Sequence, residues 1–222
     1  MKIKKLFIGC MDLLFPPRCV FCNGVVSSGS QICAKCDAEI SEVDSVKCIY
    51  IQEEGKTILC AVPYLYQNNV RQSIIRFKLY GQKQFAGLYA EKMVKHILQC
   101  YSSFQFDAVS SVPISSERRK LRGYNQSELI AREIAQQIKL PYCEYLIKIE
   151  DNKEQHKLKE KERRKNVKDV YRLCSAGCAQ GKNILLIDDI VTTGATLSEC
   201  AAVLLKNGAA MVACAAIAQV LP

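Results

Sequence analysis

The segment from Ile184 to Thr196, Ile-Leu-Leu-Ile-Asp-Asp-Ile-Val-Thr-Thr-Gly-Ala-Thr, constrains the fold more than any other part of the chain. Its first four residues are apolar, which is typical of a short, fully buried parallel strand. Asp188 and Asp189 follow where such a strand ends, and a helical pattern over 197–206 comes after the threonine-rich loop. A strand, a loop and a helix N-terminus in this order favour phosphate binding, because free backbone N–H groups and the positive end of the helix dipole point at the anion.

The side chains of this segment suit a sugar phosphate. Threonine hydroxyls can donate to phosphate, Gly194 permits a positive φ or a close backbone approach, and adjacent carboxylates can accept hydrogen bonds from a diol. The sequence therefore predicts a ribose 5-phosphate site. A buried strand followed by a capped helix is the purely structural alternative, but it needs only one of the two acids and none of the threonines.

The segment resembles the phosphoribosyl pyrophosphate (PRPP) motif of type I phosphoribosyltransferases. The resemblance implies that Asp188 and Asp189 hold the ribose 2′- and 3′-hydroxyls and that the following loop wraps the 5-phosphate. The loop residues are Thr192, Thr193, Gly194, Ala195 and Thr196. Other nucleotide-binding motifs do not fit, because the chain has neither a Walker A sequence nor a G-x-G-x-x-G fingerprint.

The length of 222 residues suits one domain of ordinary size plus a small module. No run approaches the roughly 20 apolar residues that span a bilayer. Residues 1–15 mimic a signal peptide, but Asp12 interrupts the apolar stretch and no small-residue cleavage site follows. We expect a short amphipathic helix there, a cytoplasmic protein, an N-terminal helix and metal module over 1–44, and the main domain over 45–222.

Four of the 13 cysteines form two Cys-x2-Cys knuckles separated by ten residues, Cys19 with Cys22 and Cys33 with Cys36. Two such pairs close a tetrahedral site with no open position, so the spacing predicts a structural Zn²⁺. The metal would supply much of the folding energy of so small a module. A redox dithiol is the alternative for either pair alone.

The other nine cysteines are most simply core residues, because free cysteine packs as a small hydrophobe. Cys174 and Cys178 have a spacing that also permits a metal ligand or a disulfide. The many cysteines therefore indicate one metal site plus packing residues rather than a disulfide framework.

Strand and helix patterns alternate along the main domain. The pattern predicts a hairpin over 46–66, strands over 106–112, 142–147, 184–188 and 211–218, and helices over 69–79, 85–100, 126–139 and 197–206. Such alternation implies an α/β fold with a parallel sheet covered by helices on both faces. Ligands in such sheets bind at the carboxyl ends of strands, where the loops after 112 and 188 both fall.

Two further segments offer cations to a phosphate or pyrophosphate. The loop after the 106–112 strand carries Ser115, Arg118 and Arg122, and arginine suits bidentate contact with phosphate oxygens. Lys78 lies in the last turn of the helix predicted over 69–79. The alternatives are a solvated basic loop and an exposed helix end.

Residues 152–168 hold eight Lys or Arg and three Glu. Gln155, Arg163 and Asn166 are spaced to lie along one side of a helix, with Arg164 beside them. A basic segment of this kind can close over a phosphate site as a lid or follow a nucleic-acid backbone. A solvated helix with i,i+4 ion pairs such as Glu160–Arg164 is the third reading.

Taken together, these motifs resemble the ComF (ComFC) family of competence proteins over nearly the whole chain. The resemblance rests on the zinc ribbon, Phe-Lys-x-x-Gly, Arg-Gly-Tyr-Asn-Gln-Ser-Glu-Leu, Gln-x2-Leu-x4-Arg-x2-Asn and the PRPP motif, in this order. One position departs from the family, which usually has Thr where this chain has Asn152. The resemblance implies natural transformation, with cytoplasmic handling of incoming single-stranded DNA and a ComFA-type helicase as partner.

Three functions compete. The first is a competence protein that binds PRPP and single-stranded DNA, supported by the net charge of +9. Tyr124, Phe77 and Tyr80 would then offer stacking surfaces. The second is an active phosphoribosyltransferase on an unidentified base or amine, with Mg²⁺ bound by PRPP. The third is a regulator that senses PRPP.

Overall fold

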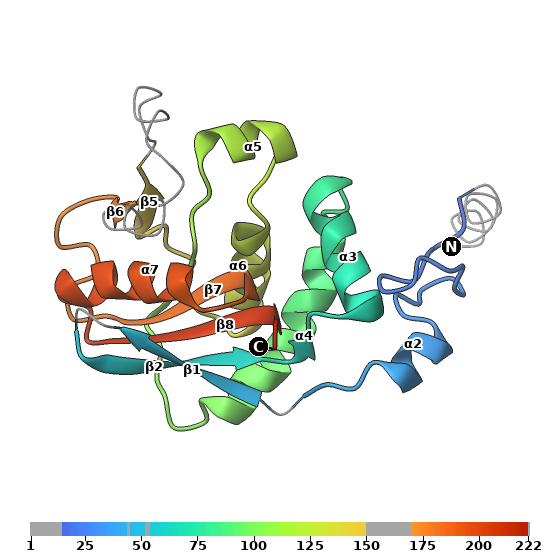
Figure 1. The fold of residues 1–222 in the computed structure, drawn as a ribbon, viewed down its shortest axis with the longest axis horizontal. Coiled ribbons are helices and arrows are strands. Elements are labelled where there is room, and N and C mark those ends of the chain that lie inside the picture. The colour runs from blue at the N-terminus through green and yellow to red at the C-terminus, as the bar shows by residue number, and fades with distance from the viewer. Residues whose placement is uncertain (1–14, 44, 52–53, 150–169, 222) are drawn as a thin grey trace.

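The computed structural model describes residues 15–43, 45–51, 54–149 and 170–221. Its strands are β1 (Ser45–Ile51), β2 (Lys56–Val62), β3 (Tyr64–Leu65), β4 (Ala108–Ser111), β5 (Leu146–Lys148), β6 (Tyr171–Leu173), β7 (Asn183–Val191) and β8 (Met211–Gln219). The main sheet has the order β1-β2-β8-β7-β4, and β3 pairs with the C-terminal end of β8 (Figure 1). The helix predicted over residues 1–15 lies outside the described residues except for Phe15, and the basic segment 152–168 lies wholly outside them.

Strands β1 and β2 form the predicted antiparallel hairpin, with Ser45 opposite Val62 and Ile51 opposite Lys56. Pro63 divides the second predicted strand into β2 and the two-residue β3. Proline has no N–H to donate, so a ladder is interrupted where it stands. The hairpin therefore adds one antiparallel edge strand to a sheet whose other pairings are parallel.

Strands β4, β7 and β8 form the parallel centre of the sheet, as predicted. The first half of β7 is buried on both faces, and so is nearly all of β8. β7 continues through Val191. Asp188 and Asp189 therefore lie in the C-terminal part of the strand rather than after it.

The prediction of a strand over 142–147 is wrong for most of its length. Only Tyr142 bridges to β4, through Val109. The chain then leaves the main sheet, because Tyr145 and Leu146 are buried in the apolar cluster on the α7 side. β5 pairs there with β6 in a separate antiparallel sheet.

Helices cover both faces of the main sheet, as the fold class predicted (Figure 1). Helices α3 (Asn68–Leu79), α4 (Phe85–Cys100) and α6 (Gln126–Gln137) contribute to the core on one face. Helix α7 (Ala195–Lys206) packs on the other. Among the described residues, none of the helices combines the length and the apolar character that crossing a bilayer requires.

Residues 116–122 form a short helix, α5 (Ser116–Arg122), where the sequence suggested a loop. Ser115 starts it by accepting a hydrogen bond from the Arg118 N–H, and Gly123 ends it with a φ of 77°. These are the usual helix start and stop residues. None of the residues of α5 is buried, and Figure 1 shows it standing away from the sheet.

Candidate functional site

The paired acids at the end of β7 are held by three different groups. Asp188 Oδ1 accepts hydrogen bonds from Ser127 Oγ at 3.0 Å and from the Asp189 backbone N–H at 2.8 Å. Lys78 Nζ lies 2.8 Å from Asp189 Oδ1. Lys78, predicted as a phosphate contact, is therefore placed against the predicted ribose acids.

Burial and charge raise the pKa of Asp188 to about 7. Loss of hydration is the largest cause and the neighbouring charge of Asp189 is the second, while the hydrogen bonds from Asp189 N and Ser127 and the charge of Lys78 oppose them. A carboxyl group balanced in this way can carry or release a proton near neutral pH.

The loop after β7 has the positive φ and the close backbone approach that the sequence allows at Gly194. Gly194 has a φ of 85° immediately before α7, and a Cβ there would lie 3.0 Å from Cγ1 of Ile49. Glycine is thus required both by the backbone and by the edge strand β1 packed beneath it. Lys47, also on β1, donates from Nζ to the Thr192 carbonyl oxygen.

The side chains around this glycine face outwards. The loop's four other predicted phosphate contacts are exposed: Thr192, Thr193, Ala195 and Thr196. Gly194 has no side chain with which to cap α7, so the N-terminus of the helix lacks a side-chain cap. The backbone N–H of Ala195 donates to Thr193 Oγ1 at 3.3 Å. The loop therefore offers hydroxyl and backbone donors together.

The segment Tyr124 to Glu128 acts as a brace behind the acids. Asn125 caps α6 by accepting from the Ser127 N–H and donates from Nδ2 to the Val112 carbonyl oxygen at 2.9 Å. Gln126 Nε2 donates to the Lys78 carbonyl oxygen at 3.4 Å, and Ser127 reaches Asp188. The brace thus carries Ser127 and holds the backbone from which the Lys78 side chain extends.

Sequence reasoning missed Ser127. The only signal available was its place in the first turn of a helix after an asparagine cap, in a segment that follows a strand end. That pattern predicts a helix start but not the contact with Asp188, which depends on how α6 packs beside β7.

The expected stacking surfaces are reduced to one residue. Phe77 and Tyr124 are buried and pack against each other with ring centroids 6.0 Å apart, so neither can receive a base. Tyr80 at the end of α3 is 67% exposed. It follows Lys78 by two residues and is the aromatic side chain of this group that remains accessible.

The other predicted phosphate contacts lie on or beside α5. Ser115 caps that helix and Arg118 is exposed near its start. Arg122 donates to Gln126 Oε1 at 3.1 Å, which links it to the brace. The lid or nucleic-acid residues Gln155, Arg163, Arg164 and Asn166 lie outside the described residues.

The four knuckle cysteines come together as predicted. One ligand atom from each of Cys19, Cys22, Cys33 and Cys36 lies within 4.8 Å of the others. Backbone N–H groups of Gly24, Cys33 and Cys36 each point at a ligand sulfur at 3.4 Å. Such donors stabilise thiolates, so the residues present fit a closed, structural Zn²⁺ site.

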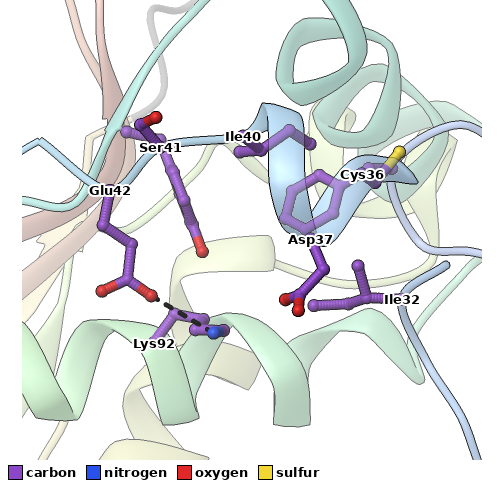
Figure 2. A pocket seen from close by; sticks show the side chains of 9 residues that line it. Ile32, Cys36, Asp37, Ile40, Ser41, Glu42 and Lys92 are labelled. Atoms are coloured by element: carbon purple, nitrogen blue, oxygen red, sulfur yellow. Dashed lines mark ion pairs between the residues drawn. The ribbon is translucent and has the colours of Figure 1, made fainter. Parts of the chain in front are cut away.

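A small cavity of about 260 Å³ lies where the zinc ribbon meets the main domain (Figure 2). Residues of helix α2 (Ala34–Glu39) and of the linker after it line one side, and Lys92 of α4 lines the other. Glu42 crosses between them, with one oxygen 3.2 Å from Lys92 Nζ and the other 2.9 Å from Lys95 Nζ. The linker is therefore tied to α4 by an ion-pair network.

Comparison with known families agrees with this two-part organisation. The chain matches the model of a double zinc ribbon domain over residues 10–56 and that of a phosphoribosyl transferase domain over residues 125–221. It is thus a zinc-ribbon protein with a phosphoribosyltransferase domain, which confirms the predicted fold class and the structural zinc.

The chain is also similar in sequence to several named proteins. The chain is 32% identical over 147 residues to competence protein ComFC of Bacillus subtilis, covering 66% of this chain and 58% of that protein. It is 26% identical over 197 residues to competence protein F of Haemophilus influenzae, covering 86% and 80%. It is 36% identical over 107 residues to DNA utilization protein YhgH of Escherichia coli K12, covering 48% and 46%. These relatives confirm the resemblance to ComF-type proteins, although the alignment with the YhgH proteins spans only 46–61% of their length.

Solved phosphoribosyltransferases are also similar. Adenine phosphoribosyltransferase from Thermoanaerobacter pseudethanolicus has a TM-score of 0.40 at 11% identity, covering 83% of this chain and 98% of that one. The glutamine PRPP amidotransferase of Bacillus subtilis has a TM-score of 0.39 at 21% identity, covering 61% and 26%.

The raised pKa of Asp188 predicts a pH-dependent stability. Its proton is held more tightly in the folded chain than in the unfolded chain, where the pKa is near 3.8. The stabilisation is therefore fully present below about pH 4 and is lost as pH rises towards about 7. Asp188→Asn cannot ionise and should show a smaller decline. Urea unfolding of both proteins between pH 5 and pH 7 tests this, and parallel declines would contradict it.

We expect substitutions of the cluster cysteines and of a cysteine outside the cluster to differ sharply in their effect on zinc content and soluble yield. Cys19→Ser or Cys36→Ser should lose zinc and most soluble protein, because the ribbon has little core without the metal. Cys48→Ser is the matched control, since Cys48 is an exposed cysteine of β1 outside the cluster. Elemental analysis and soluble yield provide the measurements. A soluble Cys36→Ser protein with full zinc content would refute the site.

Proposed function

We propose that this chain is a ComF-type competence protein that acts in DNA uptake and binds PRPP through its phosphoribosyltransferase fold. The observation that carries the proposal is the end of β7, where two carboxylates lie beside a glycine-hinged, hydroxyl-rich loop at a helix N-terminus. The names of the relatives, competence protein and DNA utilization protein, support the biological setting. The division of the chain at residue 44 and a cytoplasmic location belong to the same proposal.

Ligand binding would use each part of the site differently. The ribose hydroxyls donate to Asp188 and Asp189, and the 5-phosphate accepts from the loop Thr192–Thr196. Lys78 is paired with Asp189 at 2.8 Å, so a ribose at that acid competes with the ammonium group and leaves it free to meet the pyrophosphate. Mg²⁺ would arrive chelated by the pyrophosphate and would offset its charge.

Turnover is the second candidate function, favoured by the complete PRPP motif. Transfer requires stabilisation of the departing pyrophosphate. Lys78, which pairs with Asp189, and Arg122, which donates to Gln126, are the cations that we assign to this role. An acceptor base or amine would complete the reaction. A regulator that senses PRPP would use the same contacts without transfer.

The role proposed for Asp188 and Asp189 can be tested by measuring PRPP binding. Asp188→Ala combined with Asp189→Ala should abolish PRPP binding, because the ribose diol loses both acceptors. Calorimetric titration with Mg²⁺ and PRPP measures this, and a pyrophosphate assay on the same samples separates an enzyme from a sensor. Asp107→Ala is the matched control, because Asp107 is an exposed acid that accepts from Asn183 at the opposite end of β7. Equal binding by the double variant and wild type would remove this site.

We further propose that the chain binds single-stranded DNA and works with a ComFA-type helicase. Support for DNA binding comes from the net charge of +9, from the exposed cations of α5 and from the exposed ring of Tyr80. Backbone contacts make such binding fall steeply with salt, while an aromatic side chain adds stacking with any base.

Tyr80 gives this proposal a specific test. Tyr80→Ala should weaken binding of a labelled oligothymidine about fivefold or more, because one stacked base is worth about 1–3 kcal/mol. Tyr50→Ala is the control. Tyr50 is 60% exposed and follows Ile49 on β1, so it points to the opposite face from the residue beneath the phosphate loop. Fluorescence anisotropy across a salt series measures both variants, and equal losses would argue against a stacking role for Tyr80.

A further inference from the structure

Helix α3 presents a polar stripe to the zinc ribbon. Asn69, Ser73 and Arg76 are spaced i, i+4 and i+7, so they share one face of the helix. Asn69 Nδ2 lies 3.8 Å from Cys36 Sγ, a ligand sulfur, and Ser73 Oγ donates to the Val20 carbonyl oxygen at 2.6 Å. Asn69 and Ser73 therefore contact the two cysteine knuckles, and Arg76 contacts the first of them.

Arg76 makes the strongest of these contacts. Its NH2 group donates at 2.7 Å to the carbonyl oxygens of both Val20 and Phe21, the two residues between Cys19 and Cys22. Those carbonyls face the guanidinium only when the first knuckle has its folded turn. Among the described residues Arg76 has no carboxylate partner, whereas a zinc ion with four thiolates carries a formal charge of −2. The guanidinium is thus suited to the charge of the loaded ribbon.

The opposite side of α3 reaches the candidate ribose site. Lys78 follows Arg76 by two residues, which places it about 200° around the helix, and its ammonium group lies 2.8 Å from Asp189. Tyr124 donates from its hydroxyl to the Phe77 carbonyl oxygen, and Gln126 donates to that of Lys78. The last turn of α3 therefore lies between the first knuckle and the brace that holds Asp188.

We propose that Arg76 is a positioning residue that couples the metal-bound ribbon to the PRPP site through α3. Zinc in the ribbon holds the knuckle carbonyls, the carbonyls hold Arg76, and the helix turn that follows sets Lys78 against Asp189. Zinc occupancy then raises the affinity for PRPP, and by linkage PRPP raises the affinity for zinc by the same factor. This inference rests on the proposed binding of PRPP to the acids.

A purely structural interface would behave differently. Loss of a contact between two modules lowers the melting temperature but leaves ligand affinity and zinc retention independent of each other. Coupling requires that each ligand change the affinity for the other by the same factor. The reciprocal effect on zinc is therefore the readout that a merely stabilising Arg76 would not produce.

The experiment compares wild type, Arg76→Gln, Arg76→Lys and Arg71→Gln as full-length, zinc-loaded proteins. Arg71 is an exposed cation on the same helix, so its loss changes net charge equally without touching the knuckle. Zinc content is measured first, and only samples with full zinc are used. PRPP affinity is then measured by calorimetry with Mg²⁺. The equilibrium partitioning of zinc between the protein and a competing chromogenic chelator is measured with and without PRPP.

The expected result is a roughly tenfold weaker PRPP affinity in Arg76→Gln, about 1.4 kcal/mol, with wild-type affinity in Arg71→Gln. PRPP should shift the zinc equilibrium towards the wild-type protein and should have little effect in Arg76→Gln. Arg76→Lys keeps the charge but not the paired donors and should fall between them. Failure of wild type to bind PRPP would overturn the proposed function. Binding by wild type with an unchanged PRPP affinity in Arg76→Gln, or a zinc affinity that does not change with PRPP, would overturn the coupling alone.

Discussion

Two carboxylates side by side at the end of a buried strand are costly to ionise together. Contacts from other parts of the structure offset this electrostatic cost. Asp189 is paired with Lys78 from α3, and Asp188 is met by Ser127 from α6 and by a backbone N–H of its own strand. Helices from two different parts of the chain must therefore converge on one strand end. The brace formed by 124–128 makes that convergence possible, because it joins the start of α6 to the last turn of α3.

The zinc ribbon is part of this arrangement rather than an appendage. Phe21 lies within the first knuckle, yet its ring packs against Tyr64 at 5.7 Å and Tyr89 at 6.5 Å, in the same apolar cluster that supports α4. Burial of such a ring stabilises by roughly 1.5–3 kcal/mol. A metal ion that shapes the knuckle thus contributes to a core shared by both modules.

Local pattern was enough to predict the hairpin, the parallel strands, four of the helices and the four-cysteine cluster, because each depends on periodicity or short spacing. The departure of residues 142–147 from the main sheet was not predictable in this way. Tyr145 and Leu146 become buried only through packing with α7 and β6. The cap residues Ser115 and Gly123 were present in the sequence, but a solvated helix of seven residues has no apolar period to reveal it. Ser127 and the pairing of Lys78 with Asp189 depend on tertiary packing alone; the roles of the site residues themselves stay predictions.

The segment from 113 to 123 leaves and re-enters the domain at a single point. Val112 is fixed to β7 by its N–H, which donates to the Ile187 carbonyl oxygen at 2.9 Å, and its own carbonyl oxygen accepts from Asn125 at 2.9 Å. Residues 113–123, α5 included, form an excursion of the Ω-loop kind, closed at its neck and exposed at its tip, where Leu121 is 82% exposed. Changes of length or sequence in such a loop leave the sheet untouched. The molecule therefore keeps, next to its most constrained residues, a region where evolution can alter what is recognised at little cost to folding.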